Sequence, residues 1–174
     1  MNLFSGAGIK LLAYLAANPG REFYQREIAR ETDVSAGAVN QYLRAFAVEG
    51  LVLGRKRGRM FFYSLNLDNP AVRAFKVFLT VLELNPLLES IKDASDKILL
   101  FGSCAEGTDY EESDIDLFIL AQEKERVKKE LAGFRSAKKI SPLILNSNEL
   151  VKLKQDDKPL YERIMKGREL WKKK

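Results

Sequence analysis

The sequence predicts an α+β protein of two domains, and two changes in its hydrophobic pattern support this prediction. Apolar residues recur at helical spacing up to Gly50, and a strand-like pattern around a basic turn follows. From Asp96 onward, strand-like and helix-like segments alternate. A chain of 174 residues can hold two compact cores. We expect domains at residues 1–68 and 95–174, joined by linker helices at residues 69–94.

Three helices are expected in the first part of the chain. The first carries apolar residues at helical spacing and ends at the sequence NPG, residues 18–20. The second runs from about residue 24 to 31 and the third from about 36 to 49. Ser35 is a typical N-cap for the third helix, and Gly50 is a typical stop.

A basic hairpin follows these helices. The segment LVLGRKRGRMFFYSLN predicts two strands that are joined by a basic turn containing glycine. Three helices followed by such a hairpin make a winged helix-turn-helix. Over residues 5–66 the chain resembles winged helix-turn-helix regulators of archaea and bacteria, which implies operator binding, usually as a dimer.

The polar face of the third helix and the hairpin suit a DNA duplex. Asn and Gln side chains can pair with adenine, Arg can pair with guanine, and cations can bind phosphates. The formal net charge of +5 also favours a polyanionic partner. A solvated helix face or a protein-docking module would show the same pattern, so these alternatives stay open. The predicted DNA-binding residues are Ser35, Asn40, Gln41, Arg44, Arg55, Lys56, Arg57 and Arg59.

Helices and strands are also expected in the rest of the chain. Residues 69–94 predict two helices that are separated at Pro86, the first of which packs on the N-terminal domain or forms a dimer seam. Strands are then predicted at KILLFGS, SDIDLFILA and KKISPLILN. Helices are predicted at QEKERVKKELAGF, SNELVKLKQ and KPLYERIMKG. These segments make a small domain of alternating strands and helices.

The composition excludes several classes of chemistry. The chain has no histidine, so His general bases, Ser-His-Asp triads and His-ligated zinc are excluded. Carboxylates, Lys, Tyr, Ser or a hard metal with oxygen ligands remain. The single cysteine, Cys104, excludes an internal disulfide and fits a reducing compartment. With no apolar stretch as long as a membrane span and no signal peptide, we expect a cytoplasmic protein without a membrane partner.

Four residues at the end of the first strand and the start of the second strand of the C-terminal domain point to phosphate and metal. Gly102 lets the backbone approach a ligand, and Ser103 offers a hydroxyl and an N–H group to a phosphate oxygen. Asp114 and Asp116 are one residue apart, so in a strand both carboxylates project from one face. Such a pair can hold divalent ions that bind a nucleoside triphosphate. In the alternative interpretation, Asp114 caps the loop and Asp116 lies at a frayed strand end.

The stretch GSCAEGTDYEESDIDLFIL resembles the signature of the polymerase-beta-like nucleotidyltransferases, and most closely that of the minimal nucleotidyltransferases of prokaryotes. The resemblance covers about residues 90–170 and implies a mixed sheet with flanking helices. It also implies transfer of a nucleoside monophosphate, with Mg²⁺ or Mn²⁺ held by the catalytic residues Asp114 and Asp116. The nucleotide would bind at Gly102, Ser103 and Ser113. The matching residues are Gly102, Ser103, Ala105, Gly107, Ser113, Asp114, Asp116 and Leu117.

Two departures from the family pattern leave two functions open. Cys104 and Glu106 stand where active members usually carry Arg, and KKISPLILN has Ser141 where the family normally has a third carboxylate. One hypothesis is a Mg²⁺-dependent nucleotidyltransferase that modifies a protein or a small acceptor. The alternative is a DNA-binding regulator or antitoxin whose impaired transferase domain binds nucleotide or a partner. Minimal members often pair with an HEPN-domain protein, which we expect as a partner here together with DNA and a second copy of the chain.

Overall fold

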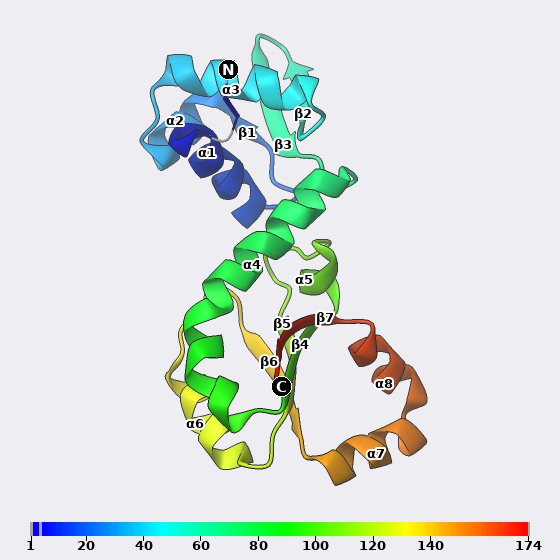
Figure 1. Cartoon of the computed structure of the whole chain (residues 1–174). Coiled ribbons are helices and arrows are strands. Elements are labelled where there is room, and N and C mark those ends of the chain that lie inside the picture. The colour runs from blue at the N-terminus through cyan, green and yellow to red at the C-terminus, as the bar shows by residue number, and fades with distance from the viewer. Residues whose placement is uncertain (1, 4, 174) are drawn as a thin grey trace. The chain divides into compact units, whose positions relative to one another are not determined.

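The chain folds into two units, Met1–Lys76 and Val77–Lys174, in a computed structural model that describes residues 2–3 and 5–173. The boundary between the units falls within one long helix, α4 (Pro70–Ile91; Figure 1). None of the described helices is both long and apolar enough to cross a membrane.

The N-terminal unit consists of three helices and a three-stranded antiparallel sheet. The strand order is β1-β3-β2. The elements are α1 (Gly6–Ala17), β1 (Phe23–Tyr24), α2 (Gln25–Thr32), α3 (Ala36–Val48), β2 (Val52–Arg57) and β3 (Met60–Leu65). The three predicted helices and the hairpin are therefore present at the expected positions. Strand β1 was not predicted, because two residues are too short to show an alternating pattern.

Local signals explain where helix α3 begins and ends. The Ser35 hydroxyl accepts a hydrogen bond from the Ala38 N–H at 3.3 Å, as an N-cap does. At the other end Gly50 has a φ of 68°, a left-handed conformation that glycine adopts without steric cost. Along the helix, Val39, Leu43 and Phe46 are buried and share one face. The opposite, polar face is left for solvent or a ligand.

Helix α4 corrects the prediction of two helices separated at Pro86. The helix is continuous, and Pro86 lies inside it. Proline removes one backbone hydrogen bond, but Pro86 and Leu82 are both exposed, so water can satisfy the carbonyl group of Leu82. The other face of the same helix is held by Leu84, Leu87 and Ile91, which are almost completely buried. Burial of that face outweighs the local cost of the proline.

The C-terminal unit is built on a mixed sheet with the strand order β6-β5-β4-β7. Only the β5–β6 pair is parallel. Strand β6 lies at an edge of this sheet, where Pro142 is exposed and can be tolerated without a backbone N–H. Besides the end of α4, the elements are η1 (Lys92–Ala94), β4 (Lys97–Phe101), α5 (Ser103–Glu106), β5 (Ile115–Leu120), α6 (Lys124–Gly133), β6 (Ile140–Leu145), α7 (Ser147–Asp156), α8 (Lys158–Met165) and β7 (Arg168–Lys172).

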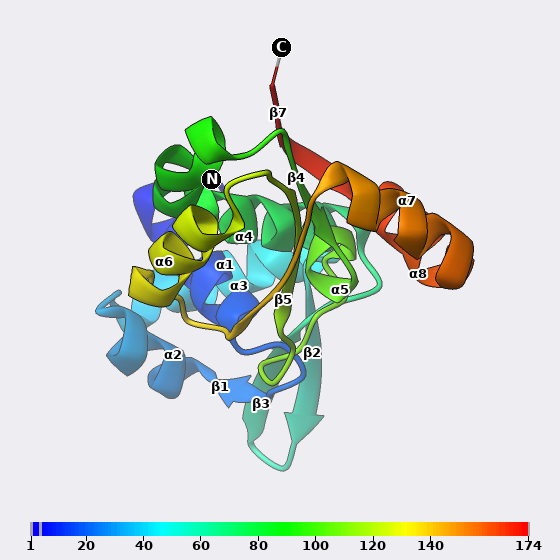
Figure 2. The ribbon, with the colours of Figure 1, turned by 90° about the horizontal axis from the view of Figure 1, so that it is seen from below.

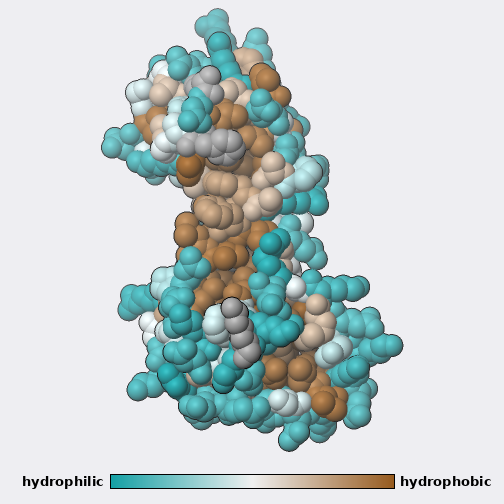
Figure 3. Space-filling model, viewed as in Figure 1, coloured by the Kyte–Doolittle hydropathy of each residue, from teal (hydrophilic) through white to brown (hydrophobic). Residues whose placement is uncertain are grey.

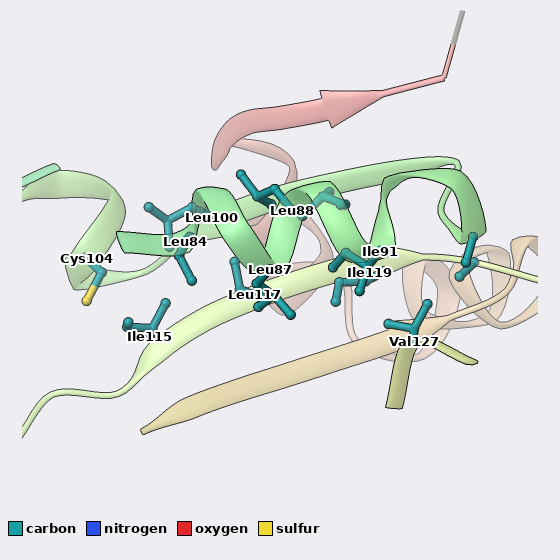
Figure 4. Packing of buried hydrophobic residues seen from close by; sticks show 13 residues of the cluster. Leu84, Leu87, Leu88, Ile91, Leu100, Cys104, Ile115, Leu117, Ile119 and Val127 are labelled. Atoms are coloured by element: carbon teal, nitrogen blue, oxygen red, sulfur yellow. The ribbon is translucent and has the colours of Figure 1, made fainter. Parts of the chain in front are cut away.

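Helices cover both faces of this sheet. Helix α6 and the end of α4 cover one face, and α7 with α8 covers the other (Figures 1 and 2). Strand β5 serves both layers, because its side chains alternate. Ile115, Leu117 and Ile119 enter the cluster with α4 and α6 (Figure 4), whereas Phe118 packs on the side of α7 and α8. This alternation decides which way the carboxylates on β5 face.

Two elements of the C-terminal unit were not predicted. Helix α5 has only four residues, so no apolar period reveals it. Strand β7 lies in a lysine-rich tail and pairs with β4 in antiparallel fashion. Both elements lie beside the end of β4, where the candidate site is found.

Candidate active site

Of the two aspartates predicted as catalytic, Asp116 lies on β5, on the side of the sheet that faces α7 and α8, and Asp114 lies just before this strand. Asp116 is directly opposite Phe101, the last residue of β4, in the antiparallel register. Phe101 and Phe118 belong to the apolar cluster on that side, and Asp116 shares their face because side chains alternate along a strand. Asp114 precedes Asp116 by two residues and lies close enough to raise its pKa. The structure therefore brings the two carboxylates together.

Gly102 leaves the end of β4 in close contact with Asp116. Its φ is 69°, and a Cβ atom at this position would lie 2.4 Å from Oδ2 of Asp116. That distance is far below a van der Waals contact. Glycine is therefore required at this position for two reasons: the backbone is left-handed, and the Asp116 carboxylate occupies the space that a side chain would need.

Neighbouring charges and burial act in opposite directions on the pKa of Asp116. Partial burial raises the pKa of this carboxyl group, and the neighbouring Asp114 raises it further, while the positive charge of Arg163 on α8 opposes both effects. Asp114 has a weak cationic neighbour, since Nζ of the largely exposed Lys139 lies 3.6 Å from its Oδ2. A cation bound between the two carboxylates would reduce their repulsion and would stabilise both in the charged form.

The predicted serines differ in their surroundings. Ser103 is the first residue of α5, directly after Gly102. Ser113 instead closes the acidic loop, because its hydroxyl accepts a hydrogen bond from the Tyr110 N–H at 2.9 Å. The Ser113 N–H in turn donates to the Tyr110 carbonyl group at 3.1 Å. In this structure the Ser113 hydroxyl positions the loop that leads to Asp114.

Hydrogen bonds and an ion pair hold helix α5 and the loop before β5 in place beside the carboxylates. The buried thiol of Cys104 on α5 donates a hydrogen bond to the Asp114 carbonyl oxygen, with 3.4 Å between sulfur and oxygen. Asp109, also buried, forms an ion pair with Lys138. The Lys138 ammonium group donates a second hydrogen bond to the Tyr110 carbonyl group at 2.7 Å. These contacts fix the loop between β4 and β5, and so the placement of Asp114.

A family model described as "Polymerase beta, Nucleotidyltransferase" matches residues 83–174, which is more than half of the chain and includes this site. The chain belongs to this nucleotidyltransferase family. No curated protein and no solved structure matches it. The nucleotidyltransferase domain thus begins within α4, before its first strand.

The nucleotidyltransferase domain lacks the third carboxylate. In the parallel β5–β6 register, Ser141 lies beside Asp116. Glu149 follows the other end of β6, where it accepts hydrogen bonds from Lys124 and caps α7. Among the described residues, no three carboxylates or thiols form a cluster that could hold a metal. Asp114 and Asp116 supply carboxylate oxygens of the kind that a divalent ion prefers, but no third acid of the described residues joins them to complete a site for two ions.

Sequence reasoning missed a group of cations beside the carboxylates. A cavity of about 340 Å³ opens at Gly102 and is lined by Arg163, Lys166 and Arg168 together with Glu106. All three cations come from the end of α8 and the start of β7. In the sequence these cations show only as basic residues spaced around Gly167. No local pattern predicted that this segment pairs with β4.

The predicted DNA-binding residues lie in different surroundings within the N-terminal unit. Asn40, Arg44 and Arg59 line one groove of about 610 Å³ between α3 and the hairpin, where Tyr24 and Phe61 add aromatic surface. The other predicted residues lie outside this groove. Gln41, Arg55 and Lys56 are exposed, Ser35 caps α3, and Arg57 pairs with Glu22 at 2.6 Å while lying over the Phe62 ring.

The substitution Gly102→Ala is expected to lower the free energy of unfolding by about 1–3 kcal/mol, because the new methyl group displaces the Asp116 carboxylate and φ stays positive. Denaturant unfolding at neutral pH measures this loss. Gly133→Ala is the matched control, since an added Cβ there meets nothing within 4 Å. Equal unfolding midpoints for Gly102→Ala and the wild type would contradict the close contact.

Asp116 is expected to make the protein less stable as pH rises. A carboxyl group whose folded-state pKa is raised stabilises the fold fully below its ordinary value of 3.8, and this contribution is lost as pH rises through the raised value. Asp116→Asn removes this loss, so at neutral pH and without divalent ions the variant should be more stable than the wild type. Urea unfolding from pH 3.5 to 7 measures the difference, with Asp156→Asn, an exposed position on α7, as the control. Parallel pH profiles for wild type and Asp116→Asn would show that the carboxyl is not perturbed.

Proposed function

We propose that the chain is a divalent-metal-dependent enzyme that transfers a nucleoside monophosphate from a nucleoside triphosphate to a protein or small acceptor. We further propose that its N-terminal unit is a winged helix-turn-helix that binds DNA. The observation that carries the first part is the carboxylate of Asp116 on β5 against Gly102, with the second carboxylate, Asp114, just before the strand and near enough to raise the Asp116 pKa. Membership of the nucleotidyltransferase family supports the reaction class.

The two carboxylates suit the binding of Mg²⁺ or Mn²⁺, since these ions prefer oxygen ligands. A bound ion would neutralise phosphate charge and polarise the phosphoryl group. In the transfer, the oxygen of an acceptor hydroxyl would form a bond to the α-phosphorus, the bond from that phosphorus to the bridging oxygen would break, pyrophosphate would leave, and the hydroxyl proton would pass to water. Gly102 allows close approach of the phosphates, and the Ser103 hydroxyl and N–H groups offer them hydrogen bonds.

A second candidate function has its own supporting observation. The position beside Asp116 on the neighbouring strand is Ser141, and the cation of Lys139 approaches Asp114. A serine hydroxyl is a poor general base, so β6 offers no carboxylate here that would accept the proton of the attacking hydroxyl. This arrangement favours a DNA-binding regulator or antitoxin whose nucleotidyltransferase domain binds nucleotide without turnover.

The groove of the N-terminal unit supports DNA binding. Asn40 and Arg44 lie on the polar face of α3 and carry side chains that recognise adenine and guanine, respectively. Arg59, at the turn of the hairpin, lines the same groove and can neutralise a phosphate. Lys56 and Arg55 extend this basic surface along β2. An HEPN-domain partner and a homodimer remain predictions. Figure 3 shows hydrophobic surface where α4 lies in Figure 1, and the exposed Phe78 and Leu82 of this helix would suit such contacts.

Transfer is tested with each of the four α-labelled ribonucleoside triphosphates, with Mg²⁺ or Mn²⁺, on the full chain and on the product of a neighbouring reading frame. We expect label on the acceptor to fall by about a hundredfold or more in Asp114→Asn and Asp116→Asn, because each removes a ligand of the ion. Asp156→Asn is the matched control and should keep the transfer.

The outcomes of this assay separate the two candidate functions. Nucleotide binding without label transfer in the wild type would favour the regulator. Transfer that persists in both site variants would place the reaction elsewhere. Failure of every nucleotide to bind, with either ion, would contradict both candidates.

DNA binding is tested by a mobility shift with the DNA upstream of the gene. Arg44→Ala and Arg59→Ala should each weaken binding by about three- to thirtyfold, since each removes a cation from the groove. If Arg59 binds a phosphate, its loss should also reduce the slope of log affinity against log salt by about one. Lys10→Ala on α1, exposed and absent from the groove, is the control. A shift that does not depend on salt would contradict this interface.

A further inference from the structure

The cations around the cavity beside Gly102 belong to a segment that the nucleotidyltransferase motif does not include. Arg163 lies on α8, Lys166 follows its end, and Arg168 begins β7. Together with Glu106 they give the cavity wall an excess of two positive charges. The motif itself, GSCAEG, contains neither Lys nor Arg, so positive charge near Gly102 comes from the C-terminal segment.

The fold holds this segment tightly against β4. A Cβ at Gly167, just before β7, would lie 2.6 Å from the Leu100 carbonyl oxygen and 3.0 Å from Cβ of Phe101, so glycine is required where the chain passes β4. In the β4–β7 register Arg168 lies opposite Leu100, two residues before Gly102. The position of these cations beside the end of β4 is therefore set by backbone packing.

Arg163 links the cavity to the carboxylates. Its guanidinium carbon lies 5.6 Å from the centre of the Phe101 ring, and Phe101 is the strand partner of Asp116. Cations over aromatic faces keep a defined orientation.

The three cations make no close ion pair within the part of the chain that the structure describes, and Glu106 is the one acidic side chain among the residues that line the cavity. Among the described residues, none of the three cations lies within 4 Å of a carboxylate oxygen as an ion pair, whereas many other Lys and Arg side chains of this unit do. Three like charges around one cavity repel one another unless an anion enters. A polyphosphate meets this requirement, because its several oxygens can accept charge-assisted hydrogen bonds from all three side chains.

We propose that Arg163, Lys166 and Arg168 bind the triphosphate of the nucleotide, and so take over the charge neutralisation that the motif lacks. The inference rests on the proposed function, since it names how that same site selects its substrate. It predicts that affinity depends on the number of phosphates and little on the base. It also explains how a motif that contains Glu106 instead of a cation can accept so anionic a ligand.

Titration calorimetry on the full chain tests this with Mg²⁺ and, separately, inorganic triphosphate, ATP, ADP and AMP. Arg163→Gln, Lys166→Gln and Arg168→Gln should each weaken inorganic triphosphate and ATP binding by about five- to tenfold, and AMP binding much less. The double variant Lys166→Gln/Arg168→Gln should weaken both further, and Arg163→Lys should retain more affinity than Arg163→Gln. Lys152→Gln, which removes one exposed cation from α7 outside this cavity, is the matched control.

The results distinguish this inference from the proposed function. If the wild type binds ATP and the cation variants bind it equally well, the inference is wrong while the proposed function stands. If the wild type binds neither inorganic triphosphate nor any of the four ribonucleoside triphosphates, both are wrong. Because the three side chains are exposed, denaturant unfolding should show wild-type stability for Lys166→Gln and Arg168→Gln, so lost affinity in these variants reports on the cavity.

Discussion

The antiparallel pairing of β4 with β5 is the constraint on which the candidate active site depends. Its register sets Asp116 opposite Phe101, and the chain then turns at Gly102 against the carboxylate. A shift of one residue would reverse the faces of β5. It would turn Asp116 into the apolar cluster of α4 and α6 and would turn Ile115 and Leu117 toward the side of α7 and α8. The apolar core on both faces therefore fixes the orientation of the carboxylates.

The site is a balance of opposite charges drawn from distant parts of the sequence. Two carboxylates come from the start of β5, and three cations come from the segment that joins α8 to β7. Each group is destabilised by repulsion within itself, and a metal ion with a polyphosphate would relieve both at once. Ser141 stands where a third acid is expected. Such a site is better suited to binding a nucleotide than to removing a proton from an acceptor hydroxyl.

Much of this could be predicted from the sequence, and what could not has a physical reason. Helical and strand periods located α1, α3, β4 and β5, and the spacing of Asp114 and Asp116 predicted that their carboxylates lie near each other. The continuity of α4 through Pro86 was not predictable, because it depends on which face of the helix is buried. The cations at the cavity were missed because their closeness to Gly102 arises from the pairing of β7 with β4, which no local pattern reveals.

The edge position of β6 has a consequence for association between copies of the protein. An edge strand offers unpaired backbone groups to any other strand, and proteins commonly protect such edges with proline or charge. Pro142 removes one N–H group from the middle of β6, and Arg168 and Lys172 place charge on β7 at the opposite edge. Both open sides of the sheet are thus poor templates for strand addition, which disfavours growth of the sheet into aggregates.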